Sequence, residues 1–276
     1  MVRSFAFALL GLLGACAGSM GLPSERLPRS TSVAEIPETE ATLGADLEAI
    51  RVDGVRVAAL PPSDELIVTA AFEALRDRVG AVRAAAAQDP QAPDFRGVLT
   101  LEVDRDLPSR VLLQLVYTGA QAGFAKQWLV VADRAGQRRG ISLALPEVSA
   151  VTAAAPAKEE KKEKAGTWAN PRLDLDPARG FVLHLQDDVV DPGPGLVLGC
   201  TPSPCTAWPF VELNRLARRT KLDHPRDRTI QLIPEGSVPL QVLVGTLDAT
   251  RDDRIVGHGA RELFPVVQLA LAEETP

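Results

Sequence analysis

The amino-acid sequence predicts an α/β (α+β) protein built from two small repeated β-α-β-α-β domains, each a sheet with helices packed on one face. Three observations support this prediction. The chain has 276 residues and is 46% hydrophobic, so it is long enough for about two domains and can bury a core. Short runs of alternating apolar residues are separated by segments with apolar residues at helical spacing. This order of segments occurs twice, before and after a stretch rich in Lys and Glu.

The first half contains two predicted crossovers. Residues 51–60 alternate like a strand, residues 64–88 are Ala-rich with a helical apolar stripe, and residues 98–103 form a second strand. Pro108 begins the next helix because proline suits the first helical turn, and Gly123 ends it. Two further strands are expected at residues 128–132 and 140–145. Helices that join successive strands in this way should lie on one face of a sheet.

The second half repeats this order. An offset of 131 positions aligns residues 98–117 with residues 229–248 without a gap, and it places Pro108 on Pro239. The two halves are therefore interpreted as copies of one unit. Strands are expected at residues 180–186, 196–198, 229–233 and 265–271, and helices at residues 208–221 and 239–250.

Composition predicts the domain boundaries. Six consecutive residues, 158–163, are Lys or Glu, which is typical of a solvated connector or an exposed helix. Residues 16–45 are rich in Ser, Pro, Thr, Glu and Gly, and we expect them to be a flexible tether. The resulting division is a domain at residues 46–150, a charged linker at 151–170 and a domain at 171–276.

Residues 1–15 are expected to be a signal peptide. They combine Arg3 with an apolar run that is shorter than the roughly 20 residues of a membrane-spanning helix. The sequence from Leu13 to Cys16, Leu-Gly-Ala-Cys, resembles a bacterial lipobox, which implies cleavage before Cys16 and lipid attachment to its thiol. The alternative is a plain secretory signal. The resemblance implies anchoring on the periplasmic side of the envelope, and Ala17 favours the outer membrane over the inner one.

Cys200 and Cys205 are separated by four residues in a Pro-rich turn. An exported chain meets an oxidising compartment, so we expect a local disulfide between them. A zinc knuckle and two free thiols are the alternatives, but the neighbouring sequence offers no further soft metal ligands.

Residues 98–132, VLTLEVDRDLPSRVLLQLVYTGAQAGFAKQWLVVA, resemble the periplasmic domain of ExbD and TolR biopolymer transport proteins. The shared pattern is a strand, a polar turn at Asp104, Leu107-Pro108, a helix that ends at Gly123-Phe124, and an aliphatic strand. Residues 229–250 with 265–271 resemble a second, more divergent copy.

This resemblance implies a module that dimerises, meets partner proteins of the ExbB/TolQ or ExbD/TolR type, and contacts the cell wall. The family also has a transmembrane helix whose Asp takes part in proton coupling. The chain has no such helix, and Asp104 and Asp106 lie in the predicted folded domain, so proton conduction is not expected.

No catalytic, metal or cofactor motif stands out. The sequence has no G-x-S-x-G, H-E-x-x-H or phosphate-loop motif. We expect His184 on the face of a strand, and His224 and His258 have no obvious triad partner. Paired acidic residues such as Asp174 and Asp176 lack calcium-loop spacing and suit turns. Net charge is −6 and only 4% of residues are aromatic, which disfavours nucleic-acid binding. We expect no metal and no cofactor.

One predicted helix carries a basic patch, which would meet an anionic wall polymer or partner. The alternative is a solvated helix face. The patch consists of Arg215, Arg218, Arg219 and Lys221.

The leading functional hypothesis is a non-enzymatic envelope lipoprotein that serves as an accessory or scaffold of an ExbB/ExbD- or TolQ/TolR-like energised transport system. The first alternative is a stand-alone lipoprotein that binds peptidoglycan or another glycan. The second is a hydrolase with residues scattered along the chain, which a deep polar pocket with a His–carboxylate pair would favour. We further expect the sheets containing residues 99–103 and 229–233 to pair within one chain, mimicking a dimer.

Overall fold

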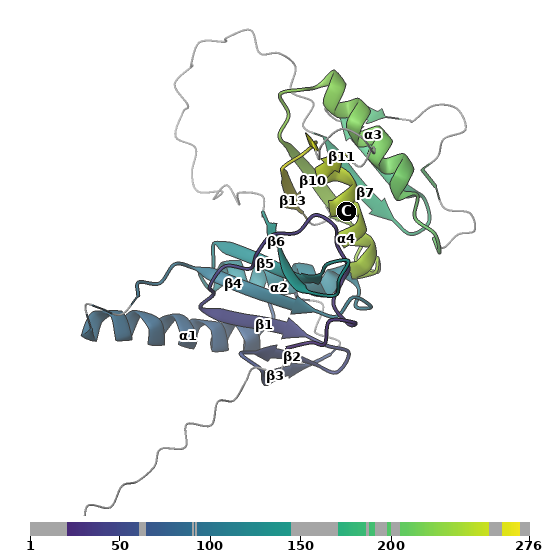
Figure 1. Ribbon diagram of the computed structural model, residues 1–276. Helices are drawn as coiled ribbons and strands as arrows, with labels where there is room; N and C mark the ends of the chain where they lie inside the picture. The colour runs from purple at the N-terminus through teal and green to yellow at the C-terminus, as the bar shows by residue number, and fades with distance from the viewer. Residues whose placement is uncertain are drawn as a thin grey trace, which may run out of the picture.

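The computed structural model describes residues 21–60, 65–89, 91, 93–144, 171–185, 188–190, 198–199, 205–253 and 261–270. These residues form a mixed α/β structure with two main sheets and four helices (Figure 1). The predicted signal peptide, Cys16, the linker at 151–170 and Cys200 lie outside the described residues. Within them, no helix has the length and apolar character needed to cross a membrane.

The first sheet has six strands in the order β3-β2-β1-β4-β5-β6. Strands β1, β4 and β5 run parallel, and the other strands pair antiparallel with their neighbours. Its elements are β1 (Ala41–Ala45), β2 (Ala49–Val52), β3 (Val55–Ala59), α1 (Thr69–Gln88), β4 (Val98–Val103), α2 (Ser109–Gln121), β5 (Lys126–Ala132) and β6 (Arg138–Leu143).

The second sheet has five strands in the order β13-β10-β7-β8-β9. Strands β7, β10 and β13 run parallel, and β8 and β9 extend the sheet as antiparallel neighbours. Its elements are β7 (Arg172–Asp176), β8 (Gly180–Leu185), β9 (Asp188–Val190), α3 (Phe210–Asp223), β10 (Thr229–Pro234), α4 (Leu240–Arg251) and β13 (Val266–Leu269). Between α4 and β13 lies a short ladder of β11 (Asp252–Asp253) and β12 (Arg261–Glu262).

The five strands of the second sheet follow the same order and directions as β5-β4-β1-β2-β3 of the first. Strands β4 and β10 begin 131 positions apart, and so do helices α2 and α4. Each half is therefore β-β-β-α-β-α-β, with an antiparallel hairpin ahead of the predicted crossovers.

The predicted strand at residues 51–60 is in fact two strands, β2 and β3. They turn at Asp53 and Gly54, which have φ values of 48° and 81°, as a tight hairpin turn requires.

The helices of the first sheet pack on one of its faces. Leu99, Leu101 and Val103 alternate along β4 toward that face and join a core with Leu75 of α1 and Leu112 of α2. Helix α2 begins at Ser109, one residue after its predicted start at Pro108, and Gly123 lies just beyond its end with a φ of 103°. This left-handed conformation suits glycine because it lacks a Cβ.

Residues 21–40, which we call the strap, cover the opposite face of the first sheet (Figure 1). Leu27 is fully buried against Val130 and Ala132 of β5. Backbone groups of Ala34 and Gly140 exchange two hydrogen bonds of 2.9 Å. The prediction of a flexible tether at residues 16–45 is therefore wrong from residue 21 onward, where the strap leads into β1. A few apolar side chains and the unpaired edge of β6 are enough to order this polar segment.

Candidate functional site

The two halves of the chain meet at the starts of α2 and α4. The N–H of Ser109 donates to the carbonyl of Val238 at 2.7 Å, and the N–H of Leu240 donates to Leu107 at 2.8 Å. Residues 107 and 109 correspond to 238 and 240 at the offset of 131 positions, so the two hydrogen bonds are reciprocal. A second pair follows the same offset: Arg110 donates to Gly236 at 3.2 Å and Gln241 to Arg105 at 3.1 Å.

Local backbone conformation explains this contact. Pro108 and Pro239 precede the helices with extended ψ angles of 146° and 142°. The first N–H groups of a helix have no acceptor within that helix. Here each helix start finds acceptors in the turn of the other half. Leu107, Val238 and Leu240 are buried beside these bonds, so one apolar core continues through the junction.

The two halves contact each other within one chain, but their sheets do not pair in the way that the sequence predicted. Strand β4 is hydrogen-bonded to β1 and β5, and β10 to β7 and β13, so β4 and β10 do not pair. The halves are joined by the helix starts and by a second contact at the sheet edges. There the N–H of Leu269 donates to the carbonyl of Ala144 at 3.1 Å.

The strap ties the two halves together. Its Ser30 hydroxyl, the Thr31 N–H and hydroxyl, and the Ser32 N–H all donate to the carboxylate of Asp248 on α4. On its other side, the N–H of Ser30 donates to the carbonyl of Ala132 in β5 at 3.0 Å. The same short segment therefore contacts the first sheet and the second half.

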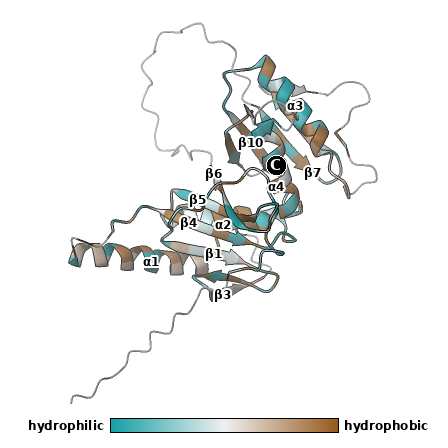
Figure 2. Cartoon of the chain, in the orientation of Figure 1, coloured by the Kyte–Doolittle hydropathy of each residue, from teal (hydrophilic) through white to brown (hydrophobic). Residues whose placement is uncertain are grey.

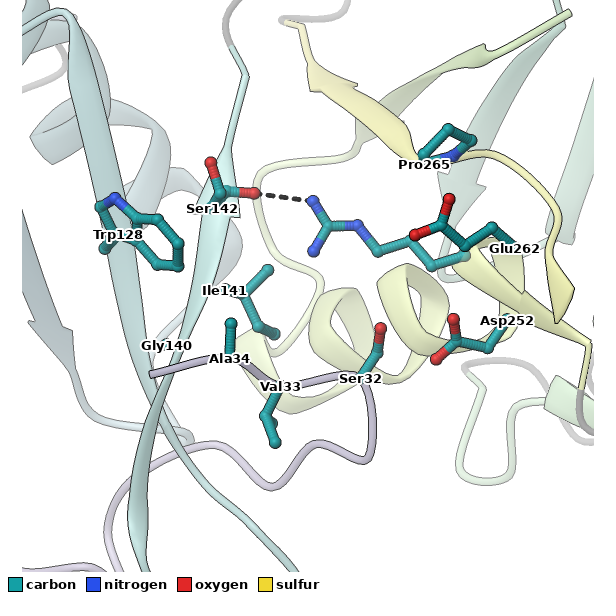
Figure 3. Close-up of a pocket in the computed structure, with 11 residues that line it drawn as sticks. Ser32, Val33, Ala34, Trp128, Gly140, Ile141, Ser142, Asp252, Glu262 and Pro265 are labelled. Atoms are coloured by element: carbon teal, nitrogen blue, oxygen red, sulfur yellow. Dashed lines mark hydrogen bonds between the residues drawn. The ribbon is translucent and has the colours of Figure 1, made fainter. Parts of the chain in front are cut away.

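A cavity of about 230 Å³ lies where the strap, the β5–β6 pair and the end of α4 meet (Figure 3). Trp128 and Ile141 line it from the first sheet, opposite Asp252 and Glu262 of the β11–β12 ladder. A Cβ at Gly140 would lie 2.9 Å from the Trp128 ring, so glycine at this position leaves the room that the indole needs beside β6. The cavity is thus built from both halves and the strap.

Arg251 crosses the junction beside this cavity. Its Nη2 donates to the carbonyl of Ser142 at 2.7 Å, while its Nε is buried with no hydrogen-bond acceptor. Burial lowers the pKa of Arg251, and the carboxylates of Asp252, Asp248 and Glu262 oppose that shift. An arginine remains protonated under such conditions, so the cavity holds a fixed positive charge.

The structure separates the four residues of the predicted basic patch. Arg215 is exposed and lies 4.0 Å from Glu212, and Arg218 lies 3.5 Å from Asp253. Lys221 donates from Nζ to the Asp227 carbonyl and lies 5.5 Å from the centre of the Phe264 ring. Arg219 is exposed. Only Arg215 and Arg219 are fully on the surface, and Lys221 supports the packing of α3.

Cys205 is disulfide-bonded. Its predicted partner, Cys200, lies outside the described residues, so the pairing stays a prediction.

His184 forms a His–carboxylate pair with Asp174, on the face of the second sheet opposite its helices. Its Nε2 lies 3.0 Å from Oδ2 of Asp174, and Oδ1 of Asp174 accepts from Arg172 at 2.9 Å. All three side chains point away from the helix-covered face, because Leu173 and Leu183 occupy that face. This arrangement holds β7 to β8. Among the residues that the structure describes, no group of three or more His, Cys, Asp or Glu side chains could hold a metal ion.

Of the other acidic pair, Asp104 is buried and ion-paired with Arg26 of the strap. Its Oδ1 accepts from the N–H of Asp106 at 2.9 Å, and Asp106 itself is exposed. The pair therefore shapes the turn between β4 and α2, and Asp104 also binds the strap.

Comparisons with protein-family models, with curated proteins and with solved structures give no match.

Sequence reasoning missed the residues that build the junction. Gln241 and Asp248 bind the strap, and Arg251 lines the cavity. The available signal was their position in α4, an otherwise largely apolar helix. Polar side chains in such a helix are costly to bury unless they have partners. The partners, however, lie more than 100 residues away in the sequence.

Proposed function

We propose that the chain is a non-enzymatic envelope lipoprotein that acts as an accessory or scaffold module of an ExbB/ExbD- or TolQ/TolR-like energised transport system. The observation that carries this proposal is the reciprocal pair of hydrogen bonds from Ser109 to Val238 and from Leu240 to Leu107. They join two halves of the same strand order in one chain. The family that the sequence resembles uses dimers of such a domain, and a single chain that supplies both halves would offer a permanent pair.

The strap supports a role at the membrane surface. If Cys16 is lipidated, only four residues separate it from Gly21, where the described part of the strap begins, so the two Cα atoms are five chain steps apart. An extended chain spans at most about 3.6 Å per residue, so the anchor would lie within roughly 18 Å of the strap. A body held this close to the bilayer would meet membrane-embedded partners more readily than one on a long tether.

One edge of the first sheet has no strand beside it among the described residues, and it offers a docking surface for a partner chain. Strand β3 ends the first sheet, and its Val55 is 67% exposed. An edge strand presents backbone N–H and carbonyl groups to which an extended segment can add.

The experiment is crosslinking in cells followed by affinity capture of the full-length chain with a C-terminal tag. We expect to recover an ExbB/TolQ-type or ExbD/TolR-type protein. Recovery should fall when Cys16→Ser removes the lipid anchor, while the folded body persists in the soluble fraction. Failure to recover either type of protein would overturn the transport-system role.

Recovery of wall fragments alone would instead favour the peptidoglycan-binding alternative. In that case, co-sedimentation with purified peptidoglycan should be lost when Arg218 and Arg219 are both replaced by Gln. Replacement of Arg76 and Arg83 on α1 provides a matched control, since both are exposed arginines on a different helix.

A further inference from the structure

We propose that the cavity at the junction is a binding site for a small amino-acid-type ligand that carries one carboxylate and at least one ammonium group. The proposal is independent of the transport role. It rests on three charged side chains that line one cavity and on an apolar wall opposite them (Figure 3).

Arg251 provides the contact for the carboxylate. Arg251 lines the cavity, and its Nη2 donates to the Ser142 carbonyl at 2.7 Å, which holds the charged guanidinium beside the cavity. A carboxylate is the acceptor that a guanidinium binds most strongly. Neither Asp252 nor Glu262 forms an ion pair with Arg251 within 4.0 Å in the part of the chain that the structure describes.

Asp252 and Glu262 provide the contacts for ammonium groups. They are directly opposite each other in the antiparallel β11–β12 ladder, and both line the cavity. Like charges at opposed positions of a ladder repel, and a cation placed between them removes that repulsion. Two carboxylates and one arginine leave the cavity with a net negative charge, so a ligand with two ammonium groups fits better than one with a single ammonium group.

The remaining wall and the volume limit the size of the ligand. Trp128 and Ile141 form an apolar side against which a short alkyl chain would pack. At about 230 Å³, the cavity is smaller than the roughly 300–1,000 Å³ of sites for drug-sized molecules. A diamino monocarboxylic acid combines the required charges with a short alkyl chain.

Such a ligand would hold the halves together. The cavity takes its lining from the strap, the first sheet and the β11–β12 ladder of the second half. A ligand that binds only the assembled junction stabilises it in proportion to its occupancy.

The test uses calorimetric titration of the full mature chain with L-lysine, cadaverine and hexanoate. Cadaverine lacks the carboxylate of lysine, and hexanoate lacks both amines. We expect saturable lysine binding, with each truncated probe weaker by about tenfold or more, because each loses a charge-assisted hydrogen bond. Lysine should also raise the midpoint of thermal unfolding.

Two variants locate the site. Arg251→Gln and Glu262→Gln should each weaken lysine binding by about tenfold or more, and Glu73→Gln on the exposed surface of α1 should leave it unchanged. Glu262→Gln is isosteric and lies on a short surface ladder, so it remains informative if Arg251→Gln loosens the junction. Absence of lysine binding, equal binding of the truncated probes, or unchanged binding in Glu262→Gln would each overturn the proposal.

Discussion

Gln241 and Arg29 bind each other through two hydrogen bonds, although they are 212 positions apart in the sequence. The N–H of Arg29 donates to Oε1 of Gln241 at 2.7 Å, and Nε2 of Gln241 donates to the carbonyl of Arg29 at 3.0 Å. The side-chain amide of Gln241 thus pairs with the backbone N–H and carbonyl of Arg29, as the backbone of a neighbouring strand would. The strap is consequently a shared part of both halves rather than a leader to the first.

Loss of the Asp248 carboxylate should weaken this junction. Asp248 is 4% exposed and accepts hydrogen bonds from Ser30, Thr31 and Ser32. Asp248→Ala leaves those donors without their acceptor, and hydrogen bonds to a charged group contribute about 1.5–3 kcal/mol each to stability. We expect the free energy of unfolding to fall by about 2–4 kcal/mol, measured by urea denaturation.

Asp106→Ala is the matched control, since its side chain is 71% exposed, and it should change stability by less than about 0.5 kcal/mol. Equal unfolding midpoints for the two variants would show that the hydrogen bonds between Asp248 and the strap contribute nothing to the stability of the protein.

Two helical glycines should respond in opposite directions to the same substitution. A Cβ at Gly80 of α1 would have open space, so Gly80→Ala should stabilise the protein by about 0.5–1 kcal/mol. A Cβ at Gly119 of α2 would lie 2.5 Å from Cδ2 of Leu99, which is fully buried and cannot move aside. Gly119→Ala should therefore destabilise it by about 1–3 kcal/mol. Urea denaturation midpoints measure both changes, and stabilisation by Gly119→Ala would mean that α2 is loosely packed on β4.

The regular elements were predictable because each carries a local signal. The strand at residues 98–103 agrees with the sequence prediction, and α2 begins one residue after its predicted start. Strand β1 was missed because its sequence, Ala-Thr-Leu-Gly-Ala, has only one large apolar residue and follows a polar segment. Its place between β2 and β4 is fixed by hydrogen bonds to both, which a local pattern does not reveal.

The junction was less predictable, because its contacts join distant positions. The offset of 131 aligned Pro108 with Pro239, but it could not show that these two prolines lie opposite each other. The cavity depends on Arg251, Trp128 and the strap, three parts of the chain with no common motif. Only the tertiary arrangement brings them together.

The chain should be a monomer over a wide range of protein concentration. The N–H of Ser109 donates to Val238 and the N–H of Leu240 donates to Leu107, so the first N–H groups of α2 and α4 already have acceptors within one chain. The helix starts are therefore not free to join two copies of the chain. Sedimentation velocity should give one species of constant sedimentation coefficient. A concentration-dependent dimer would mean that another surface, such as the β3 edge, drives self-association, and Val55→Lys should then abolish the dimer.

Stability should decrease on acidification in part through Glu40, which links the strap to the start of β4. Its carboxylate accepts from the N–H groups of Arg96 at 2.9 Å and Val98 at 2.7 Å. Burial raises the pKa of Glu40, but these hydrogen bonds and the Arg96 guanidinium outweigh it, so the pKa lies below its ordinary value of 4.5. A carboxyl whose pKa is lower in the folded state stabilises the protein above its unfolded pKa. That contribution is lost as the pH falls through the folded-state value.

The measurement is the urea midpoint between about pH 6 and pH 3 for the parent chain and for Glu40→Gln. The variant should be less stable at pH 6 and should show a shallower loss of stability with acid, because Gln does not titrate. Glu73→Gln controls for the loss of one surface charge. Parallel curves for Glu40→Gln and the parent would mean that the lowered pKa of Glu40 does not contribute to folding, since a titrating group can produce a pH slope only if its pKa differs between the folded and unfolded states.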